Sequence, residues 1–267
     1  MSRGSPAPGT VATTTRAAHP EVDCIVAAAL GWEARAVLGG LTDVRPRGTS
    51  GRPVWVGSAG RYRLLVVQTG IGPERVRMAL AGLDIASAGA RWLFSTGCAG
   101  ALVPDLEPGA LVVATRVVDD RGALVGRPLD AEALALQGWA QARGIATRSG
   151  SFASVGRPLL SAVEKRRAHE RLGAIAVEME GAALAAAAAE RSMSLVAIRV
   201  ILDGVDVAVP DFGAARNLSD LAGAVARHPA VLGRAARLWP AQRTARAALA
   251  RFFRAFFARD ALGALEG

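Results

Sequence analysis

The chain has 267 residues, 51% of them hydrophobic, and a formal net charge of +9 at pH 7. This length accommodates one large α/β domain or two small ones with a sizeable core. No uninterrupted apolar run reaches about 18 residues, which argues against a transmembrane helix. Three scattered His and two Cys without metal-ligand spacing argue against a metal site and a His-based triad, and free thiols predict a reducing, cytoplasmic compartment.

Strand-like and helix-like segments alternate along the chain. Residues 1–20 have no periodicity and are predicted to form a disordered tail. Strands are then predicted at Val22–Ala29, Val54–Val56, Tyr62–Gln68, Trp92–Ser95, Leu111–Val118, Ile145–Ser149 and Leu195–Leu202, and helices at Trp32–Leu38, Glu74–Leu83, Ala131–Arg143 and Ala182–Ala189. This alternation predicts an α/β fold with a mostly parallel, layered sheet.

Two glycine-rich segments, Gly70–Gly72 and Gly97–Gly100, follow predicted strands and are expected to be turns. Glycines at such places let backbone amides approach an anion or a sugar, although plain structural turns are an equally open alternative. Arg75 stands where a dinucleotide fingerprint has its third Gly, and neither segment contains the Gly-Lys-Ser/Thr of a P-loop. The sequence therefore argues against both of these nucleotide sites.

Carboxylates lie at two places within or beside apolar runs. Glu178, Met179 and Glu180 lie in an apolar stretch, and Asp203 directly follows a predicted strand. Carboxylates are rarely left in apolar surroundings unless they are paired or functional, and ligands collect at the carboxyl ends of strands in α/β folds. A helix-start Glu and an Asp in a strand-exit turn are the alternatives for each one alone. As a pair at this spacing, they predict a functional site.

Two further residues are candidates for the same site. Glu33 lies three residues after the first apolar run, where a first-turn helix Glu is the alternative. Phe152, just past Ser149–Ser151, is a candidate for stacking on a flat ring, and a core aromatic is the alternative.

The order and spacing of four segments resemble the nucleoside phosphorylase and nucleosidase superfamily: Val66–Gly72, Ser95–Leu102, Glu178–Glu180 and Arg199–Asp203. In motif, the chain is most similar to nucleosidases acting on methylthioadenosine and adenosylhomocysteine. The resemblance implies a three-layer fold with a central mixed β-sheet flanked by helices, and a catalytic domain over residues 21–225. It also implies a homo-oligomer, a small-molecule nucleoside substrate, and no cofactor, with phosphate as an alternative co-substrate.

The resemblance also implies roles for individual residues. Asp203 would be the general acid that protonates the adenine ring nitrogen, and Glu33 would orient or deprotonate the attacking water. Glu180 would bind the ribose 2′- and 3′-hydroxyls, with Met179 packed against the sugar. The other substrate-binding residues would be Glu178, Phe152, Cys98, Gly97 and Arg199, and no residue is expected to bind a metal. An acid at the base and anionic groups near the sugar suit the charges that develop when an N-glycosidic bond breaks.

Two departures from the nucleosidase pattern and one difference from the related phosphorylases bear on the substrate and the nucleophile. Cys98 and Leu202 each stand where the nucleosidases usually have Ser, which makes the predicted site less polar. Glu33 lies where related phosphorylases place a phosphate-binding Arg, with Arg35 nearby. This exchange favours water over phosphate as the nucleophile.

The last segment, residues 226–267, is predicted to be a basic, amphipathic helical extension. Arg227–Arg259 contains eight Arg and no acidic residue. On a helical projection Leu249, Phe252, Phe253, Phe256 and Phe257 share one face, and Arg243, Arg251 and Arg254 lie opposite. A basic helix with a Phe-rich face is typical of a membrane-surface element, here at the inner membrane face. The alternative is a Phe stripe packed on the domain or on another subunit.

This extension is similar to that of the hopanoid-associated phosphorylases. That resemblance implies a lipid-linked nucleoside substrate, adenosylhopane, cleaved to ribosylhopane and adenine. A nucleosidase or phosphorylase acting on a soluble substrate is the first alternative, and a non-catalytic membrane- or ligand-binding protein of the same fold is the second. No nucleic-acid partner is expected, because the chain contains no recognised nucleic-acid module.

Overall fold

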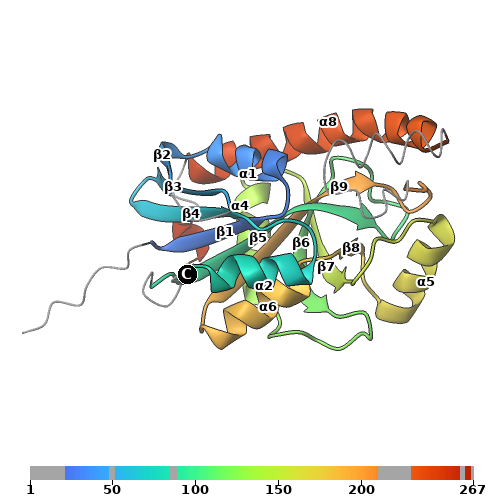
Figure 1. The fold of residues 1–267 in the computed structure, drawn as a ribbon, viewed down its shortest axis with the longest axis horizontal. Coiled ribbons are helices and arrows are strands. Elements are labelled where there is room, and N and C mark those ends of the chain that lie inside the picture. Colours follow the sequence, from blue (N-terminus) through green and yellow to red (C-terminus); the bar gives the residue numbers. More distant parts are fainter. Residues whose placement is uncertain (1–21, 48–51, 84–88, 210–229, 259–261, 266–267) are drawn as a thin grey trace, which may run out of the picture.

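The computed structural model describes residues 22–47, 52–83, 89–209, 230–258 and 262–265 (Figure 1). The predicted N-terminal tail, residues 1–20, lies outside these ranges. The elements are β1 (Cys24–Ala28), α1 (Gly31–Leu38), β2 (Thr42–Pro46), β3 (Val54–Ala59), β4 (Tyr62–Gln68), α2 (Pro73–Ala81), β5 (Trp92–Ala101), β6 (Leu111–Val118), α4 (Asp130–Gln141), β7 (Thr147–Ser154), α5 (Ala162–Leu172), β8 (Ala176–Glu178), α6 (Gly181–Glu190), β9 (Ser194–Asp203), α8 (Ala230–Phe257) and the short helix η1 (Gly263–Leu265).

The strands form one sheet in the order β2-β3-β4-β1-β5-β8-β7-β6-β9, in which β9 also pairs with β5. This second pairing closes β5, β8, β7, β6 and β9 on themselves, whereas β1 to β4 extend the open side. Strand β1 is parallel to both β4 and β5, but β5 is antiparallel to β8, and β6 is antiparallel to β9. The sheet is therefore mixed, as the family resemblance implies.

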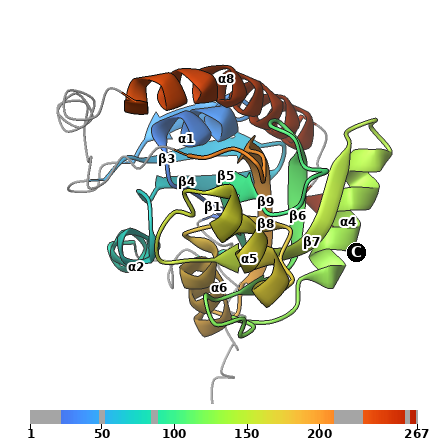
Figure 2. The same cartoon turned by 90° about the vertical axis from the view of Figure 1, so that its right-hand side faces the viewer.

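Helices cover both faces of the sheet, which gives the expected three layers. Along β1, Cys24, Val26 and Ala28 contribute to the cluster with α1, α4 and α8, whereas Ile25 and Ala27 contribute to the cluster with α2 and α6. Figure 2 shows α8 lying over α1 on one side and α6 and α2 on the other. A third, smaller cluster joins α5 to β7 and β8. Because strands such as β1 are buried on both faces, they read as continuous apolar runs in the sequence.

The prediction that Gly97–Gly100 form a turn is wrong. Strand β5 continues through them to Ala101, because β9 pairs with β5 along this stretch and keeps the backbone groups hydrogen-bonded. Gly97 lies opposite Arg199 in this register. The glycines are needed for a different reason, since carboxylate side chains lie directly against them.

Three elements were not predicted. Strand β2 is exposed at all five positions and polar, and β8 has only three residues, so neither has a visible pattern. Helix α5 is rich in charged residues and buries only Lys165, Ala168 and Leu172, so its apolar stripe is narrow. Strand β7 is shifted from its predicted position at Ile145–Ser149, because it begins at Thr147 and continues to Ser154.

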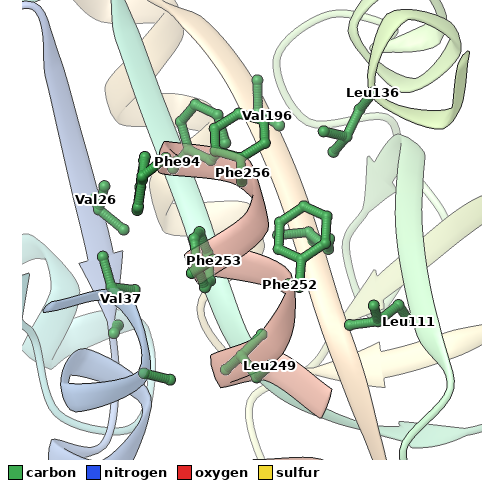
Figure 3. Close-up of a cluster of buried hydrophobic side chains, with 14 of the residues drawn as sticks. Val26, Val37, Phe94, Leu111, Leu136, Val196, Leu249, Phe252, Phe253 and Phe256 are labelled. Atoms are coloured by element: carbon green, nitrogen blue, oxygen red, sulfur yellow. The ribbon is translucent and has the colours of Figure 1, made fainter. Parts of the chain in front are cut away.

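The Phe-rich face of the last helix lies in the core. Phe252, Phe253 and Phe256 are at most 1% exposed, and their rings contact one another and Trp139 of α4. Figure 3 shows these side chains between Val26 and Val37 on one side and Leu111 and Leu136 on the other. Packing on the domain is therefore the correct alternative, and the prediction that this face is a membrane-surface element is wrong. Four Arg side chains of the same helix are exposed: Arg243, Arg246, Arg251 and Arg254.

Candidate active site

Four buried carboxylates lie where strands end and helices begin. Glu33 is in the first turn of α1, Glu178 ends β8, Glu180 precedes α6, and Asp203 ends β9. Each is at most 9% exposed. Unpaired carboxylates are costly to bury, so the contacts of each one decide its charge state.

Glu33 is held by two backbone amides. Its Oε2 accepts a hydrogen bond from the amide of Leu30 at 2.8 Å, and its Oε1 accepts one from the amide of Cys98 at 2.9 Å. Burial raises the pKa of Glu33, while these amides limit the rise. A raised pKa makes the Glu33 carboxylate a stronger base, which suits a group that accepts a proton.

Glu178 forms a buried ion pair with Arg199. Its Oε2 accepts hydrogen bonds from Nη2 of Arg199 at 2.7 Å and from the amides of Glu180 and Gly181 at 3.0 and 2.7 Å. Arg199 also donates to Oγ of Ser95 at 2.7 Å. The two amides are at the N-terminus of α6, where a negative charge is favoured. Glu178 and Arg199 therefore set the position at which α6 begins.

Glu180 is linked to the first glycine-rich turn. Its Oε1 accepts a hydrogen bond from the amide of Gly72 at 2.7 Å, so this turn does contribute a backbone amide to the site. Burial, and then the nearby charge of Glu178, raise the pKa of Glu180 to about 7. Its carboxyl group is therefore half-protonated near neutral pH.

Asp203 forms an ion pair with Lys165 of α5, and both side chains are buried. Burial raises the pKa of Asp203, and the Lys165 ammonium opposes part of that rise. A buried acid whose pKa is raised is suited to keeping a proton until a substrate needs it.

Cys98 lies among these carboxylates. Burial raises the pKa of its thiol well above the usual range, and the charges of Glu33, Glu180 and Asp203 add to the rise. The thiol is therefore neutral at physiological pH and is not an activated nucleophile. The structure thus brings together candidates from four separate parts of the sequence, represented by Glu33, Cys98, Glu180 and Asp203.

The remaining predicted residues, Gly97, Met179 and Phe152, differ in how they lie relative to the carboxylates. Gly97 lies against the Glu33 carboxylate, and Met179 is partly buried beside the α5 cluster. Phe152 is 1% exposed and belongs to the main core cluster, so its stacking on a base stays a prediction.

In the described parts of the chain, no group of three or more His, Cys, Asp or Glu is arranged to hold a metal ion. No helix among the described residues has both the length and the apolar character needed to cross a membrane.

Two residues of the site were missed by sequence reasoning. Ser95 is within the Ser95–Leu102 segment, but nothing in the pattern shows that it binds Arg199. Lys165 lies in a helix that was not predicted, although the sequence does contain a signal: it is the only Lys of the chain.

Within the described residues, the charges of the site do not balance if every group is ionised. Four carboxylates, Glu33, Glu178, Glu180 and Asp203, face two buried cations, Arg199 and Lys165. A surplus of buried negative charge favours protonation of one or more acids, and it favours a ligand that develops positive charge.

Comparison with models of protein families identifies the family of the chain. The family model of the phosphorylase superfamily matches residues 23–234, which is most of the chain. The chain belongs to the phosphorylase superfamily. The matched span contains all four carboxylates and both cations. The comparison with curated protein sequences gives no match.

Several solved structures share the fold. An S-adenosylhomocysteine nucleosidase from Streptococcus pyogenes is 22% identical, with a TM-score of 0.67 over 89% of this chain and 98% of that one. A 5′-methylthioadenosine/S-adenosyl homocysteine nucleosidase from Helicobacter pylori is 23% identical, with a TM-score of 0.62 over 70% and 88%. A futalosine hydrolase mutant from the same organism is 23% identical, with a TM-score of 0.59 over 67% and 89%. At these identities the likeness establishes the fold.

Gly97→Ala is expected to displace Glu33. Gly97 has φ +148°, and a Cβ there would lie 2.8–2.9 Å from the Glu33 carboxyl atoms. We expect a loss of about 1–3 kcal/mol in the free energy of unfolding, measured in urea, because backbone strain and overpacking act together. Gly138→Ala is the matched control: a Cβ at this helical position has no neighbour within 4 Å, and Ala favours the helix. Equal stability changes in both variants would contradict the assigned contact.

Proposed function

We propose that this chain cleaves the N-glycosidic bond of a 5′-substituted adenosine, with water as the nucleophile, and releases adenine. The observation that carries the proposal is the buried cluster of four carboxylates against two cations. As the C–N bond breaks, the sugar gains positive charge and the base gains negative charge. The surplus carboxylates stabilise the positive charge on the sugar, and a protonated acid neutralises the negative charge on the base.

Each carboxyl group then has a role that its contacts support. Asp203 gives its proton to a ring nitrogen of adenine while the electron pair of the C–N bond moves onto the base. Glu33 accepts a proton from the water whose oxygen bonds to the sugar. Glu180, as a carboxylate, accepts hydrogen bonds from the ribose hydroxyls. The relatives of this fold that are named as nucleosidases support hydrolysis rather than phosphorolysis.

The test is adenine release from methylthioadenosine and from adenosylhopane, each with and without phosphate. We expect adenine to appear without phosphate, together with the free 5′-substituted ribose. Release that requires phosphate and gives a ribose 1-phosphate would make the chain a phosphorylase. If neither substrate releases adenine under either condition, the proposed activity is wrong, and a non-catalytic ligand-binding role takes its place.

Within this class we infer an apolar 5′ substituent, with adenosylhopane as the specific candidate. Cys98 and Leu202 make the surroundings of the carboxylates less polar than Ser would. Ile71 is 51% exposed and directly precedes Gly72, whose amide binds Glu180. An exposed apolar side chain next to a ribose-binding group suits an apolar extension of the sugar. Turnover of methylthioadenosine alone would instead indicate a nucleosidase for soluble substrates.

The proposal includes contact with an anionic membrane surface and assembly as a homo-oligomer. The exposed Arg side chains of α8 support the membrane contact. Because the Phe face of this helix is buried, the contact would depend on electrostatic attraction between Arg and anionic lipids. Cosedimentation with anionic vesicles but not with neutral vesicles would support the contact. The mass of the protein in solution tests the oligomer.

Binding of the ribose is expected to weaken as the pH falls through about 7. Glu180 has a raised pKa, so it is protonated below this pH and offers one acceptor fewer to the hydroxyls. Hydrogen bonds to a charged group are stronger than neutral ones, so we expect affinity for a non-cleavable adenosine analogue to drop about tenfold. Calorimetry at several pH values measures this. A 2′,3′-dideoxy analogue, which lacks both hydroxyls, should show little of this pH dependence, and an equal dependence would contradict the role of Glu180.

A further inference from the structure

Lys165 is the only Lys in a chain whose other Lys/Arg positions are all Arg. It lies on α5 and is 1% exposed. A buried ammonium is costly unless each of its three N–H groups finds an acceptor. Here Nζ donates to Oδ2 of Asp203 and to the carbonyl oxygens of Gly204 and Val207, the latter two at 2.8 Å. The ammonium is thus satisfied by Asp203 and by the turn that follows β9.

One further backbone contact fixes α5 relative to this turn: the amide of Val209 donates to the carbonyl oxygen of Leu160 at 3.0 Å. The nearby ion pair between Arg166 and Asp206 is more than half exposed and contributes little. Lys165 therefore extends from a helix whose distance from the end of β9 is set by several bonds. A compact ammonium suits three converging acceptors better than a planar guanidinium, which explains a Lys in a chain that otherwise uses Arg.

We propose that Lys165 is a positioning residue for Asp203: it holds the carboxyl group through Oδ2, leaves Oδ1 to carry the proton, and stabilises the carboxylate that remains. The inference rests on the proposed function. In the step concerned, the O–H bond of Asp203 breaks and an N–H bond forms on the departing base. The negative charge left on Asp203 then lies beside the ammonium.

The charges around Asp203 give the sign of the expected pH effect. Lys165 faces it from α5, and the neutral Cys98 thiol faces it from β5. The neighbouring ion pairs, Arg166–Asp206 and Arg157–Glu164, are each balanced internally. Burial raises the pKa of Asp203 and Lys165 lowers it, so removal of the ammonium leaves this pKa higher. The acid then stays protonated to higher pH, but it is a weaker proton donor.

The test compares Lys165→Met with wild type on two substrates. The first is the adenosine that the wild type cleaves, and the second is 4-nitrophenyl riboside, whose leaving group departs without a proton. We expect kcat for adenine release to fall about 10- to 100-fold with KM little changed, because a hydrogen bond to a charged group is lost. In a plot of kcat against pH, the alkaline limb should move to higher pH by about one to two units. Hydrolysis of the nitrophenyl riboside should change little.

A structural role for Lys165 predicts a different result: both substrates would be cleaved more slowly by the same factor, with no shift of the alkaline limb. That outcome overturns the inference. The double variant Lys165→Met/Asp203→Asn, in which neither charge is left unpaired, keeps the test valid if the single variant folds poorly. We expect it to release adenine no more slowly than Asp203→Asn alone, since Lys165 acts through Asp203. If the rate loss of the double variant equalled the product of the two single losses, Lys165 would not act through Asp203. Failure of the proposed function is distinguishable, because the wild type would then release no adenine at all.

Discussion

Asp203→Asn is expected to lower the rate of adenine release about 10²- to 10⁴-fold, the usual contribution of a general acid. Asn has nearly the same shape, but it has no acidic proton to give to the departing base. Lys165 loses its anionic partner in this variant, so a lower melting temperature is also expected. Activity is therefore to be measured well below the melting temperature, and circular dichroism should show a native fold.

Two controls make the result specific to proton donation. Asp206→Asn removes a carboxylate three residues away whose ion pair with Arg166 is more than half exposed, and it should leave activity unchanged. The second control is 4-nitrophenyl riboside, on which Asp203→Asn should lose far less activity than on the adenosine. If both substrates lose activity equally, Asp203 supports the site in some way other than as its acid.

The sequence predicted the buried strands better than the rest of the fold. Strand β4 and strand β6 match their predicted ranges, because continuous runs of Val and Leu are buried on both faces.

The Gly97–Gly100 segment was wrongly predicted to be a turn, because glycines in a short stretch of sequence usually indicate a turn. In the fold, the same glycines leave room for the carboxyl groups of Glu33 and Asp203 that approach from α1 and β9. That requirement comes from residues more than 60 positions away and has no local pattern.

The buried charged residues of the candidate site were named in advance where a motif carried them, and their roles in binding and catalysis stay predictions. Glu178, Glu180, Arg199 and Asp203 were named from family resemblance, and the structure places Glu178 and Arg199 in one ion pair. The partner of Asp203 was not predictable. Lys165 lies in a charged helix, and no pattern in the sequence indicates that this helix packs near the end of β9. Composition still offered a hint, since a single Lys among many Arg is unusual.

Arg199→Met is expected to cost about 3–5 kcal/mol in the free energy of unfolding, because it leaves the buried Glu178 without its cation. Arg77→Met is a matched control: Arg77 also pairs with a Glu, but the two side chains are 65% and 75% exposed, so we expect a change within about 0.5 kcal/mol. Urea unfolding measures both. Similar values for the two variants would show that Arg199 does not stabilise the fold through its ion pair.

The cause of the Arg199 effect can be isolated by a second substitution. If the cost arises from an unpaired charge on Glu178, then Glu178→Gln added to Arg199→Met should recover part of the lost stability, since Gln carries no charge. Activity should not recover with it. The Glu178 carboxylate binds the amides of Glu180 and Gly181, so its loss displaces Glu180, the residue proposed to bind the ribose, even in a stable protein. Stability that returns without adenine release would separate the electrostatic balance of the core from the geometry that the reaction requires.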